Sequence, residues 1–379
     1  MRKKILFRIR SMEMGEAQKT LLNLLDFLDR ARYEPMVLLD FNEGELLNDI
    51  PSDIPVFFIA KGKSQLSSHR ILSFFQRMER HRLLAAYRCF PELLWSKIED
   101  VPDIEIAMMH SSLKGLMKSP FKNSTKINWF DSDINFFPKY YRKKMGRMMN
   151  LCNTTVFVTQ STQYNFENYL GIMVSNSVCI YNTFNVEEIR KKSLITLHFE
   201  DRWLFKDENI FVSVGRLVFQ KGYDLLIEVH AELIKEGINH KIMIIGDGPL
   251  YEALMKKIKL LKVEDTFLLL GNRKNPYPYI AKADYYIQSS RYEGSHLSIR
   301  EAMILGKPLI STDVGGVKEI VSHNTTGLLT HFSRYDLKNA IKKFLTDDNF
   351  VSHITENQKE IDFDHHNQRV LEQLEDILH

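Results

Sequence analysis

The sequence contains few features that would take it outside the ordinary globular proteins. Its three cysteines, Cys89, Cys152 and Cys179, are scattered and odd in number, so they indicate neither a disulfide framework nor a paired-cysteine metal site. A reducing compartment is the simplest interpretation. No stretch approaches the roughly 18 consecutive apolar residues of a membrane-spanning helix. The apolar run near the start is short and interrupted by Arg8 and Arg10, so we expect a first β-strand there rather than a signal peptide.

Neither sign of charge dominates, because the formal net charge is only +3 over 379 residues. The basic residues are concentrated in the first half, where residues 60–147 carry 17 lysines and arginines against 8 aspartates and glutamates. Such a region suits an anionic lipid surface, a phosphate-bearing substrate or nucleic acid, although a solvated face has the same composition. Residues 68–89 predict a basic helix, which we expect to lie at an anionic membrane surface. The expected location is therefore cytoplasmic, peripheral on the inner face of the cell membrane.

The order of the apolar segments indicates an α/β fold. A chain of this length favours two domains, which we place at residues 1–190 and 191–355. Strand-like runs alternate with amphipathic stretches of helical length, the pattern of a parallel sheet covered by helices. No G-x-G-x-x-G motif follows a strand, which argues against a dinucleotide dehydrogenase. The expected strands cover residues 4–8, 35–40, 104–109, 126–130 and 154–159, and then residues 209–215, 241–246, 266–271, 284–290 and 307–312.

One pair of motifs in the second half indicates a phosphate site. Gly215 and Arg216 end an expected strand, and Lys221 and Gly222 open the next helix. A diphosphate bound there would meet a guanidinium, an ammonium and a helix N-terminus together. A solvated turn can contain the same residues, so these two motifs alone leave both interpretations open.

A second pair of residues indicates a site for hydroxyl groups. Glu293 and Glu301 lie on either side of an expected helix start near Ser295. The backbone N–H groups near His296 and Leu297 would donate to a β-phosphate. Each oxygen of Glu301 can accept one ribose hydroxyl, and Glu293 would accept hydroxyls of a sugar. The plain alternative is two exposed glutamates near a helix start.

Taken in order, these motifs resemble retaining glycosyltransferases of the GT-B fold. The family is the large one of bacterial polysaccharide and lipopolysaccharide transferases (glycosyltransferase family 4, group 1). The resemblance covers most of residues 215–329, with GRLVFQKGYD, IIGDGPL and RYEGSHLSIREAM in the family's order, and it extends more weakly to MGEAQKTLLNLL near the start. It implies two Rossmann-like parallel-sheet domains facing a cleft. It also implies a C-terminal helix within 356–379 that packs back on the N-terminal domain.

The resemblance implies a role for each matching residue. Two cations would neutralise the donor diphosphate, and the two glutamates would hold the donor sugar and the ribose. The segment after Gly271 would face the base through main-chain groups. The expected catalytic residues are Glu293, Arg216 and Lys221, and the expected donor-binding residues are Glu301, Gly15, Gly215, Asn272, Arg273, His296 and Leu297.

The implied reaction is a retaining, metal-independent hexosyl transfer that needs no cofactor. The donor would be a nucleotide sugar, with UDP as the expected carrier and product. The acceptor would be a glycan or a lipid-linked saccharide in the synthesis of a bacterial surface polysaccharide such as lipopolysaccharide or capsule. No metal site is expected.

The first half departs from the family pattern. Glu16 and Gln18 stand where a glycine and a glutamate are usual. Asp131 stands where many relatives have a sugar-facing histidine, and His110 ends the preceding strand, where relatives often have an acidic residue. We expect His110 and Asp131 to share the acceptor or sugar side of the cleft with exchanged roles. The alternative is a histidine bound to backbone and an aspartate that caps a loop.

Two other functions remain open from the sequence. A catalytically inactive sugar-nucleotide-binding subunit would explain the altered first loop and the missing histidine. A nucleic-acid-binding protein would use the basic region, but it would leave Glu293 and Glu301 without a role and lacks the aromatic and zinc-finger signatures. Sugar-nucleotide epimerases and phosphorylases share the expected architecture.

Overall fold

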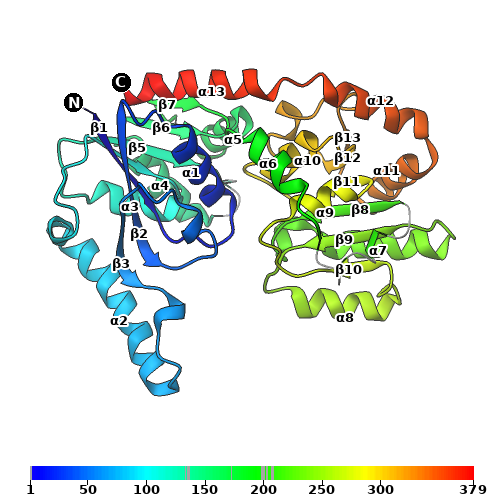
Figure 1. The fold of residues 1–379 in the computed structure, drawn as a ribbon, viewed down its shortest axis with the longest axis horizontal. Coiled ribbons are helices and arrows are strands. Elements are labelled where there is room, and N and C mark those ends of the chain that lie inside the picture. Colours follow the sequence, from blue (N-terminus) through cyan, green and yellow to red (C-terminus); the bar gives the residue numbers. More distant parts are fainter. Residues whose placement is uncertain are drawn as a thin grey trace. The chain divides into compact units, whose positions relative to one another are not determined.

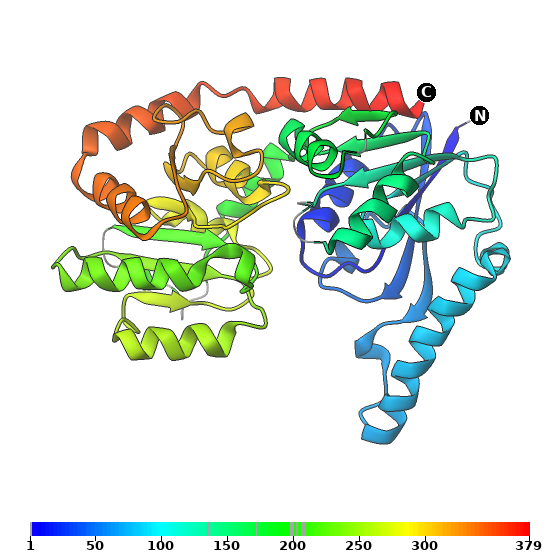
Figure 2. The same cartoon turned by 180° about the vertical axis from the view of Figure 1, so that it is seen from behind.

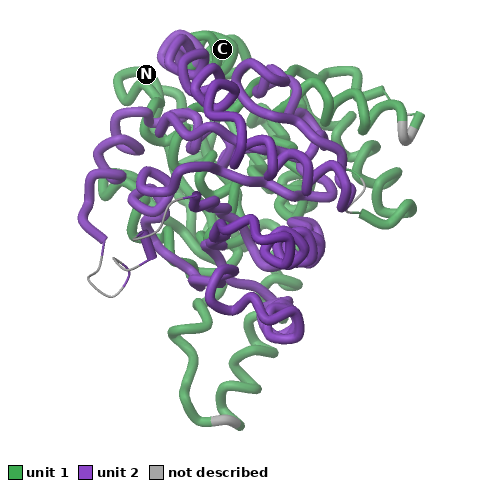
Figure 3. The backbone as a smooth tube through the Cα atoms, turned by 90° about the vertical axis from the view of Figure 1, so that its right-hand side faces the viewer, with its two compact units in different colours: residues 1–183, 367–379 green, residues 184–366 purple. Residues whose placement is uncertain are grey.

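The computed structural model describes residues 2–132, 134, 137–171, 173–197, 201, 204–205 and 209–379. The chain forms two compact units (Figure 3). Unit 1 contains residues 1–183 and 367–379, and unit 2 contains residues 184–366. Each unit is built on one parallel sheet covered by helices, so the predicted α/β class is confirmed.

Unit 1 has a seven-stranded sheet in the order β3-β2-β1-β4-β5-β6-β7, parallel throughout (Figure 1). The strand order reverses between β1 and β4, and ligands of such sheets bind beyond the carboxyl ends of the strands at this reversal. The elements are β1 (Lys3–Ile9), α1 (Glu16–Phe27), β2 (Tyr33–Asn42), β3 (Val56–Lys61), α2 (Arg70–Cys89), η3 (Pro91–Ser96), β4 (Ile104–Ala107), α3 (His110–Met117), β5 (Thr125–Phe130), α4 (Lys139–Met149), β6 (Thr154–Phe157), α5 (Gln160–Leu170), β7 (Ser177–Cys179) and, from the far end of the chain, α13 (Phe363–Leu378).

Unit 2 has a six-stranded parallel sheet in the order β10-β9-β8-β11-β12-β13. Its strand order reverses between β8 and β11. The elements are α6 (Val186–Ser193), β8 (Ile210–Val214), η6 (Phe219–Lys221), α7 (Tyr223–Lys235), β9 (Lys241–Ile245), α8 (Tyr251–Leu261), β10 (Phe267–Leu269), α9 (Tyr277–Lys282), β11 (Tyr285–Gln288), α10 (Leu297–Ile304), β12 (Leu309–Thr312), β13 (Leu328–Thr330), α11 (Arg334–Thr346) and α12 (Asp348–Lys359).

The strands expected from the apolar runs are all present, with their ends shifted by a few residues. Three further strands, β3, β7 and β13, were not expected. All three lie at the edges of their sheets, and β7 and β13 are only three residues long, so they carry no periodic pattern.

The expected domain limits fall inside α6 and α12, whereas the units divide before α6, at 183/184, and within the first turns of α13, at 366/367. Residue 190 lies within α6, whose Val186 and Ile189 are buried in the core of unit 2. Residue 356 lies within α12, whose Ile354 is also buried in unit 2. Burial of these apolar side chains explains why both helices stay whole on one side of the division.

Helix α13 returns the end of the chain to unit 1. Val370, Leu374 and Leu378 follow one another at the four-residue spacing of one helix face, and all three are buried in the core formed by β1, α1 and β2. The Tyr33 hydroxyl donates to Glu375 Oε2 at 2.8 Å. These contacts explain why residues 367–379 belong with the N-terminal unit.

A buried ionic network crosses the central strands of unit 1. Arg8 on β1 donates from Nε to Glu105 Oε2 on β4 at 2.7 Å, and Lys126 on β5 pairs with the other oxygen of Glu105. Burial alone would raise the pKa of Glu105, but the charges and hydrogen bonds of Arg8 and Lys126 bring it below its usual value. The arginine that interrupts the first apolar run is therefore an interior residue with a buried partner.

A chain of hydrogen bonds between two buried histidines joins the N-terminal ends of unit 2 strands. His230 Nδ1 and His240 Nε2 are 2.9 Å apart, His230 Nε2 contacts Thr266 Oγ1 at 2.9 Å, and His240 Nδ1 contacts the Ile238 carbonyl at 3.0 Å. Burial lowers the pKa of both imidazoles, that of His230 to about 3. Both rings are therefore neutral in the folded chain at neutral pH.

We expect this histidine pair to make the fold sensitive to mild acid. In the unfolded chain these histidines have the ordinary pKa of about 6.5 and bind protons below it. In the folded chain they stay neutral down to their lower pKa. Each such histidine therefore lowers the free energy of unfolding by up to about 1.4 kcal/mol per pH unit as the pH falls from 6.5 towards the folded pKa. Denaturant unfolding of the wild type and His230→Gln between pH 7.5 and 5 checks this. The free energy of unfolding should change less with pH in the variant than in the wild type, and equal pH dependence would contradict the prediction.

Candidate active site in unit 2

The predicted phosphate motif lies at the carboxyl end of β8. Arg216 is exposed directly after the strand, and Lys221 ends the short helix η6. Gly222 takes a left-handed conformation with φ of 68°, and a Cβ there would lie 2.0 Å from the carbonyl oxygen of Ser289. Only glycine fits this position, so it fixes the start of α7 against the end of β11. Gly215 lies against the side chain of Lys221.

Glu293 is a buried carboxylate that contacts the predicted phosphate-binding lysine. Its side chain is 1% exposed, and Lys221 Nζ donates to Oε1 at 2.6 Å. Ser290 Oγ donates to the same oxygen at 2.5 Å, and Gln220 Nε2 donates to Oε2 at 2.9 Å. The structure thus joins two predicted catalytic residues that are 72 positions apart in the sequence. In this arrangement the ammonium of Lys221 is directed to a carboxylate, as a buried charge requires.

A residue not predicted from the sequence fixes the loop that carries Glu293. Arg291 forms a two-pronged ion pair with Asp224, both contacts at 2.7 Å, and also donates to the Phe219 carbonyl. Its guanidinium lies 3.9 Å from the ring centre of Phe219 and 4.7 Å from that of Phe332. Planar, paired contacts of this kind restrict orientation as well as position. Arg291 therefore fastens the loop after β11 to the loop after β8.

The double-glycine turn after β12 packs against the same loop. Gly315 has φ of 54°, and a Cβ there would lie 2.4 Å from the carbonyl oxygen of Glu293. The main chain of this turn therefore lies directly against that of Glu293. The loops after β8 and β11 contact the Glu293 carboxylate, and the loop after β12 contacts the Glu293 main chain.

Glu301 lies on α10 and is 3% exposed. Helix α10 begins at Leu297, not at Ser295 as expected, so Glu301 is the fifth residue of the helix, just over one turn in. The Tyr277 hydroxyl on α9 donates to Glu301 Oε1 at 3.0 Å. Burial, followed by the negative charge of Glu301, raises the pKa of Tyr277 well above its ordinary value. Tyr277 was not predicted, since nothing in the local sequence connects it with a helix 20 residues further on.

His296 and Leu297 lie at the N-terminus of α10, where the expected phosphate-donating N–H groups are. Both residues are buried. His296 Nδ1 is 3.0 Å from Gln288 Nε2, and burial is the main cause that lowers the pKa of His296 to about 4. The imidazole is therefore neutral, and it connects the helix start with the end of β11.

Asn272 and Arg273 follow Gly271 after β10. Arg273 Nε donates to the Tyr279 hydroxyl at 3.0 Å, and a guanidinium nitrogen lies 3.5 Å from Asp201 Oδ1. The side chain of Arg273 is thus part of a polar cluster with α9. This is compatible with a role of residues 272–273 through main-chain groups, which stays a prediction.

The predicted residues of unit 1 lie at the carboxyl side of its sheet. Gly15 precedes α1, and the side chain of Gln18, held by a 3.0 Å bond to the Ser11 carbonyl, lies close above it. His110 opens α3 after β4, and Asp131 directly follows β5. Burial lowers the pKa of His110 and raises that of Asp131 to about 6.

His110 and Asp131 are not bonded to each other in the described part of the chain. The His110 ring packs edge-on against Phe137 at 4.6 Å, and Asp131 Oδ1 accepts from Ser132 at 3.1 Å. Their exchanged roles stay a prediction, because adjacent strands bring the two residues to the same edge of the sheet without a direct contact.

Comparison with known proteins gives one consistent result. Residues 196–361 match the family model described as glycosyl transferases group 1. An uncharacterized glycosyltransferase of Methanocaldococcus jannaschii is 26% identical over 315 residues, which cover 80% of this chain and 73% of that protein. The N-acetylgalactosamine-N,N'-diacetylbacillosaminyl-diphospho-undecaprenol 4-alpha-N-acetylgalactosaminyltransferase of Campylobacter jejuni is 31% identical over 171 residues, 45% of this chain and 44% of that protein.

Solved structures show the same fold over the whole chain. The structure of Anabaena HepE in complex with UDP and glucose has a TM-score of 0.76 and 21% identity, and it covers 99% of this chain and 100% of HepE. The structure of TarM has a TM-score of 0.75 and 15% identity, and it covers 100% of this chain and 99% of TarM. Other relatives match only 40–48% of this chain.

The buried pair of Lys221 and Glu293 leads to a stability prediction. Lys221→Ala leaves an uncompensated buried carboxylate and should lower the free energy of unfolding by about 3–5 kcal/mol. Adding Glu293→Gln removes that charge, so the double variant should recover much of the loss. Denaturant unfolding of the two variants checks this, with Lys259→Ala on the exposed face of α8 as a control near wild type. A double variant no more stable than Lys221→Ala would refute the pairing.

Proposed function

Since this chain belongs to the group 1 glycosyltransferases and has the GT-B fold, we propose that it transfers a sugar, with retention, from a nucleotide sugar to a glycan or lipid-linked acceptor. The observation that carries this proposal is the buried Glu293 carboxylate, held by Lys221 where the loops after three parallel strands meet. A buried carboxylate at the carboxyl edge of a parallel sheet is placed to accept hydroxyl hydrogen bonds from a bound sugar.

UDP is the proposed carrier. Two structural neighbours, HepE and a TarM variant, were solved with UDP. The proposed acceptor class, a lipid-linked or polymeric saccharide of the bacterial surface, is supported by relatives. One acts on a diphospho-undecaprenol saccharide, and another is a poly(ribitol-phosphate) alpha-N-acetylglucosaminyltransferase of Staphylococcus aureus.

The donor is proposed to lie along the carboxyl edge of the unit 2 sheet. Arg216, Lys221 and the N–H groups at the start of α10 would bind the diphosphate. Glu301 would accept a ribose hydroxyl with the oxygen that does not contact Tyr277, and main-chain groups of residues 272–273 would face the base. Lys221 would move from Glu293 to the phosphate, or bridge both, and so release the Glu293 oxygens for the sugar.

The proposed chemistry takes place on one face of the donor sugar. The bond from the sugar C1 to the β-phosphate oxygen breaks, and a bond from C1 to the acceptor oxygen forms on the same side. The acceptor proton passes to the leaving phosphate oxygen, giving the nucleoside diphosphate. The charge that grows on the phosphate would be stabilised by the preorganised cations at residues 216 and 221, so no metal ion is required in this scheme.

A second candidate function is a sugar-nucleotide-binding subunit without catalytic activity. Two features of unit 1 that differ from the expected family pattern favour it. The side chain of Gln18 lies over Gly15, and the His110 ring packs against Phe137 and not against Asp131. This alternative predicts nucleotide binding without turnover. A nucleic-acid-binding protein would show neither.

Nucleotide binding and turnover test these functions separately. UDP should raise the unfolding temperature more than GDP or ADP. At a UDP concentration 100 times its dissociation constant, the free energy of unfolding should rise by about 2.7 kcal/mol.

Lys221→Ala should reduce donor turnover about 100- to 1,000-fold, because it removes a preorganised positive charge, while Lys259→Ala should not. Mass spectrometry over a donor panel gives the sugar, and NMR of the product anomer gives retention. Stabilisation with no turnover on any donor would favour the inactive subunit, and no stabilisation would contradict both.

We also propose that α2 attaches unit 1 to an anionic membrane. Helix α2 projects from the unit 1 sheet (Figures 1 and 2). Its first half exposes a stripe of large apolar side chains, including Ile71 at 64%, Phe74 at 59% and Phe75 at 61% exposure. Arg77 and Arg82 are exposed on the same helix. An apolar stripe flanked by arginines suits the boundary between lipid headgroups and acyl chains. No described helix is long and apolar enough to cross a membrane.

Vesicle co-sedimentation tests this attachment. The wild type should bind vesicles that contain anionic lipid, less so at high salt, because salt screens the arginine contacts. Phe74→Ser with Phe75→Ser should reduce binding at least tenfold, whereas Leu260→Ser, at a still more exposed apolar residue on α8, should not. Equal binding to neutral and anionic vesicles, or no loss in the double variant, would overturn the proposal.

A further inference from the structure

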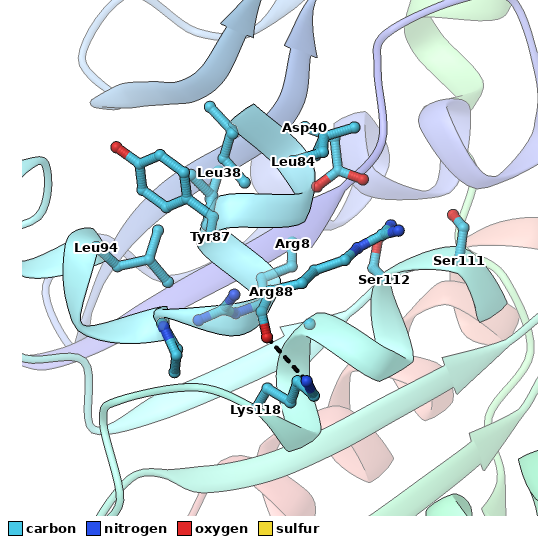
Figure 4. A pocket seen from close by; sticks show the side chains of 13 residues that line it. Arg8, Leu38, Asp40, Leu84, Tyr87, Arg88, Leu94, Ser111, Ser112 and Lys118 are labelled. Atoms are coloured by element: carbon cyan, nitrogen blue, oxygen red, sulfur yellow. Dashed lines mark hydrogen bonds between the residues drawn. The ribbon is translucent and has the colours of Figure 1, made fainter. Parts of the chain in front are cut away.

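A small pocket lies in unit 1 on the side of the sheet that carries α2 and α3 (Figure 4). It encloses about 30 Å³, room for about two water-sized groups. One part of its wall is apolar and is formed by residues such as Leu38, Leu84 and Leu94, with the ring of Tyr87. In the view of Figure 4 the polar side chains of Asp40, Ser111 and Ser112 gather on the opposite side.

Some polar groups of this wall have no hydrogen-bonded protein partner among the described residues. Ser111 Oγ and Ser112 Oγ are buried and form no hydrogen bond to any residue that the structure describes. Ser112 is 6% exposed. A buried hydroxyl without a partner destabilises the fold. Asp40 and Arg88, which also line the pocket, form no side-chain hydrogen bond or ion pair within the described ranges. Burial raises the pKa of Asp40 to about 6, and the positive charge of Arg88 acts in the opposite direction. The wall therefore presents several donors and acceptors that water or a bound polar group can satisfy.

The other cations of the wall are already engaged. Arg8 is bound to Glu105, and Lys118 Nζ donates to the Arg88 carbonyl at 2.8 Å. Asp40 and Arg88 thus leave one negative and one positive group in the same small space. An anion would be attracted by Arg88 but repelled by Asp40, and a cation would meet the reverse. Hydroxyl groups both donate and accept, so they satisfy both side chains and the two serines.

We propose that this pocket binds the hydroxyl-bearing edge of one sugar of the glycan acceptor, an inference that rests on the proposed transferase function. Asp40 accepts hydrogen bonds from neighbouring hydroxyls, Arg88 and Ser112 bind the hydroxyl oxygens, and the rest of the sugar ring stays outside the pocket. The enclosed space admits a pair of hydroxyls rather than a whole ring, so the pocket selects their positions on the sugar. Such a pocket is a specificity site for a sugar of the acceptor, separate from the donor residues of unit 2.

Saturation-transfer NMR of the full chain with a panel of methyl glycosides tests this proposal. The probes are the glucoside, galactoside, N-acetylglucosaminide and N-acetylgalactosaminide, each with UDP present. At least one should bind the wild type, and Asp40→Asn and Arg88→Gln should each weaken it about tenfold, the effect of one charged hydrogen bond. Asp53→Asn, at an exposed carboxylate of the same unit, is the matched control. Circular dichroism establishes that each variant is folded.

Three outcomes would overturn the proposal. The first is that no glycoside binds the wild type. The second is that glycoside binding is lost in Glu293→Gln but kept in Asp40→Asn, which would place the glycoside in the donor site. The third is that inorganic phosphate binds the wild type, loses its binding in Arg88→Gln and binds more strongly to Asp40→Asn, as expected of an anion site. If UDP stabilises the chain and no glycoside binds, the pocket proposal fails alone. If no nucleotide stabilises the chain, the transferase proposal fails, whatever the glycosides do.

Discussion

The need to compensate one buried carboxylate organises the donor half of this protein. Glu293 lies almost without solvent, so its charge requires close donors. Lys221, Gln220 and Ser290 supply them, and they come from the loops after β8 and β11. The turn after β12 approaches so closely that only glycine fits at residue 315. The loops after β8 and β11 thus meet at one side chain, and the loop after β12 packs against the main chain of the same residue.

The sequence allowed the local structure of the chain to be predicted better than its contacts. Apolar runs located most strands because burial imposes a visible pattern on the residues themselves. The edge strands β3, β7 and β13 were missed, whereas β10, which is as short as β7 and β13, was located by its apolar run. The motifs placed Glu293, Glu301 and Lys221 in one region through a family resemblance. The ion pair between Arg291 and Asp224, and the contact from Tyr277 to Glu301, depend on how separate elements pack, which spacing alone does not determine.

The two units differ in how closely they follow known proteins. The family match covers residues 196–361, which include all the predicted donor residues of unit 2. Unit 1 lies outside that match, and its carboxyl edge carries Gln18, His110 and Asp131. In the proposed function unit 2 holds the donor, so side chains of unit 1 are the place where a different acceptor would be accommodated without changes to the predicted donor residues.

The path of α13 has a consequence for biosynthesis. Lys3 Nζ donates to the carbonyls of Leu378 and His379, and Val370, Leu374 and Leu378 complete a core that begins with β1. All the strands and other helices of unit 2 are made before these residues. During synthesis on the ribosome unit 2 can therefore finish folding first, although its sequence comes second. Part of the apolar core of the N-terminal unit stays uncovered until residues 367–379 emerge from the exit tunnel.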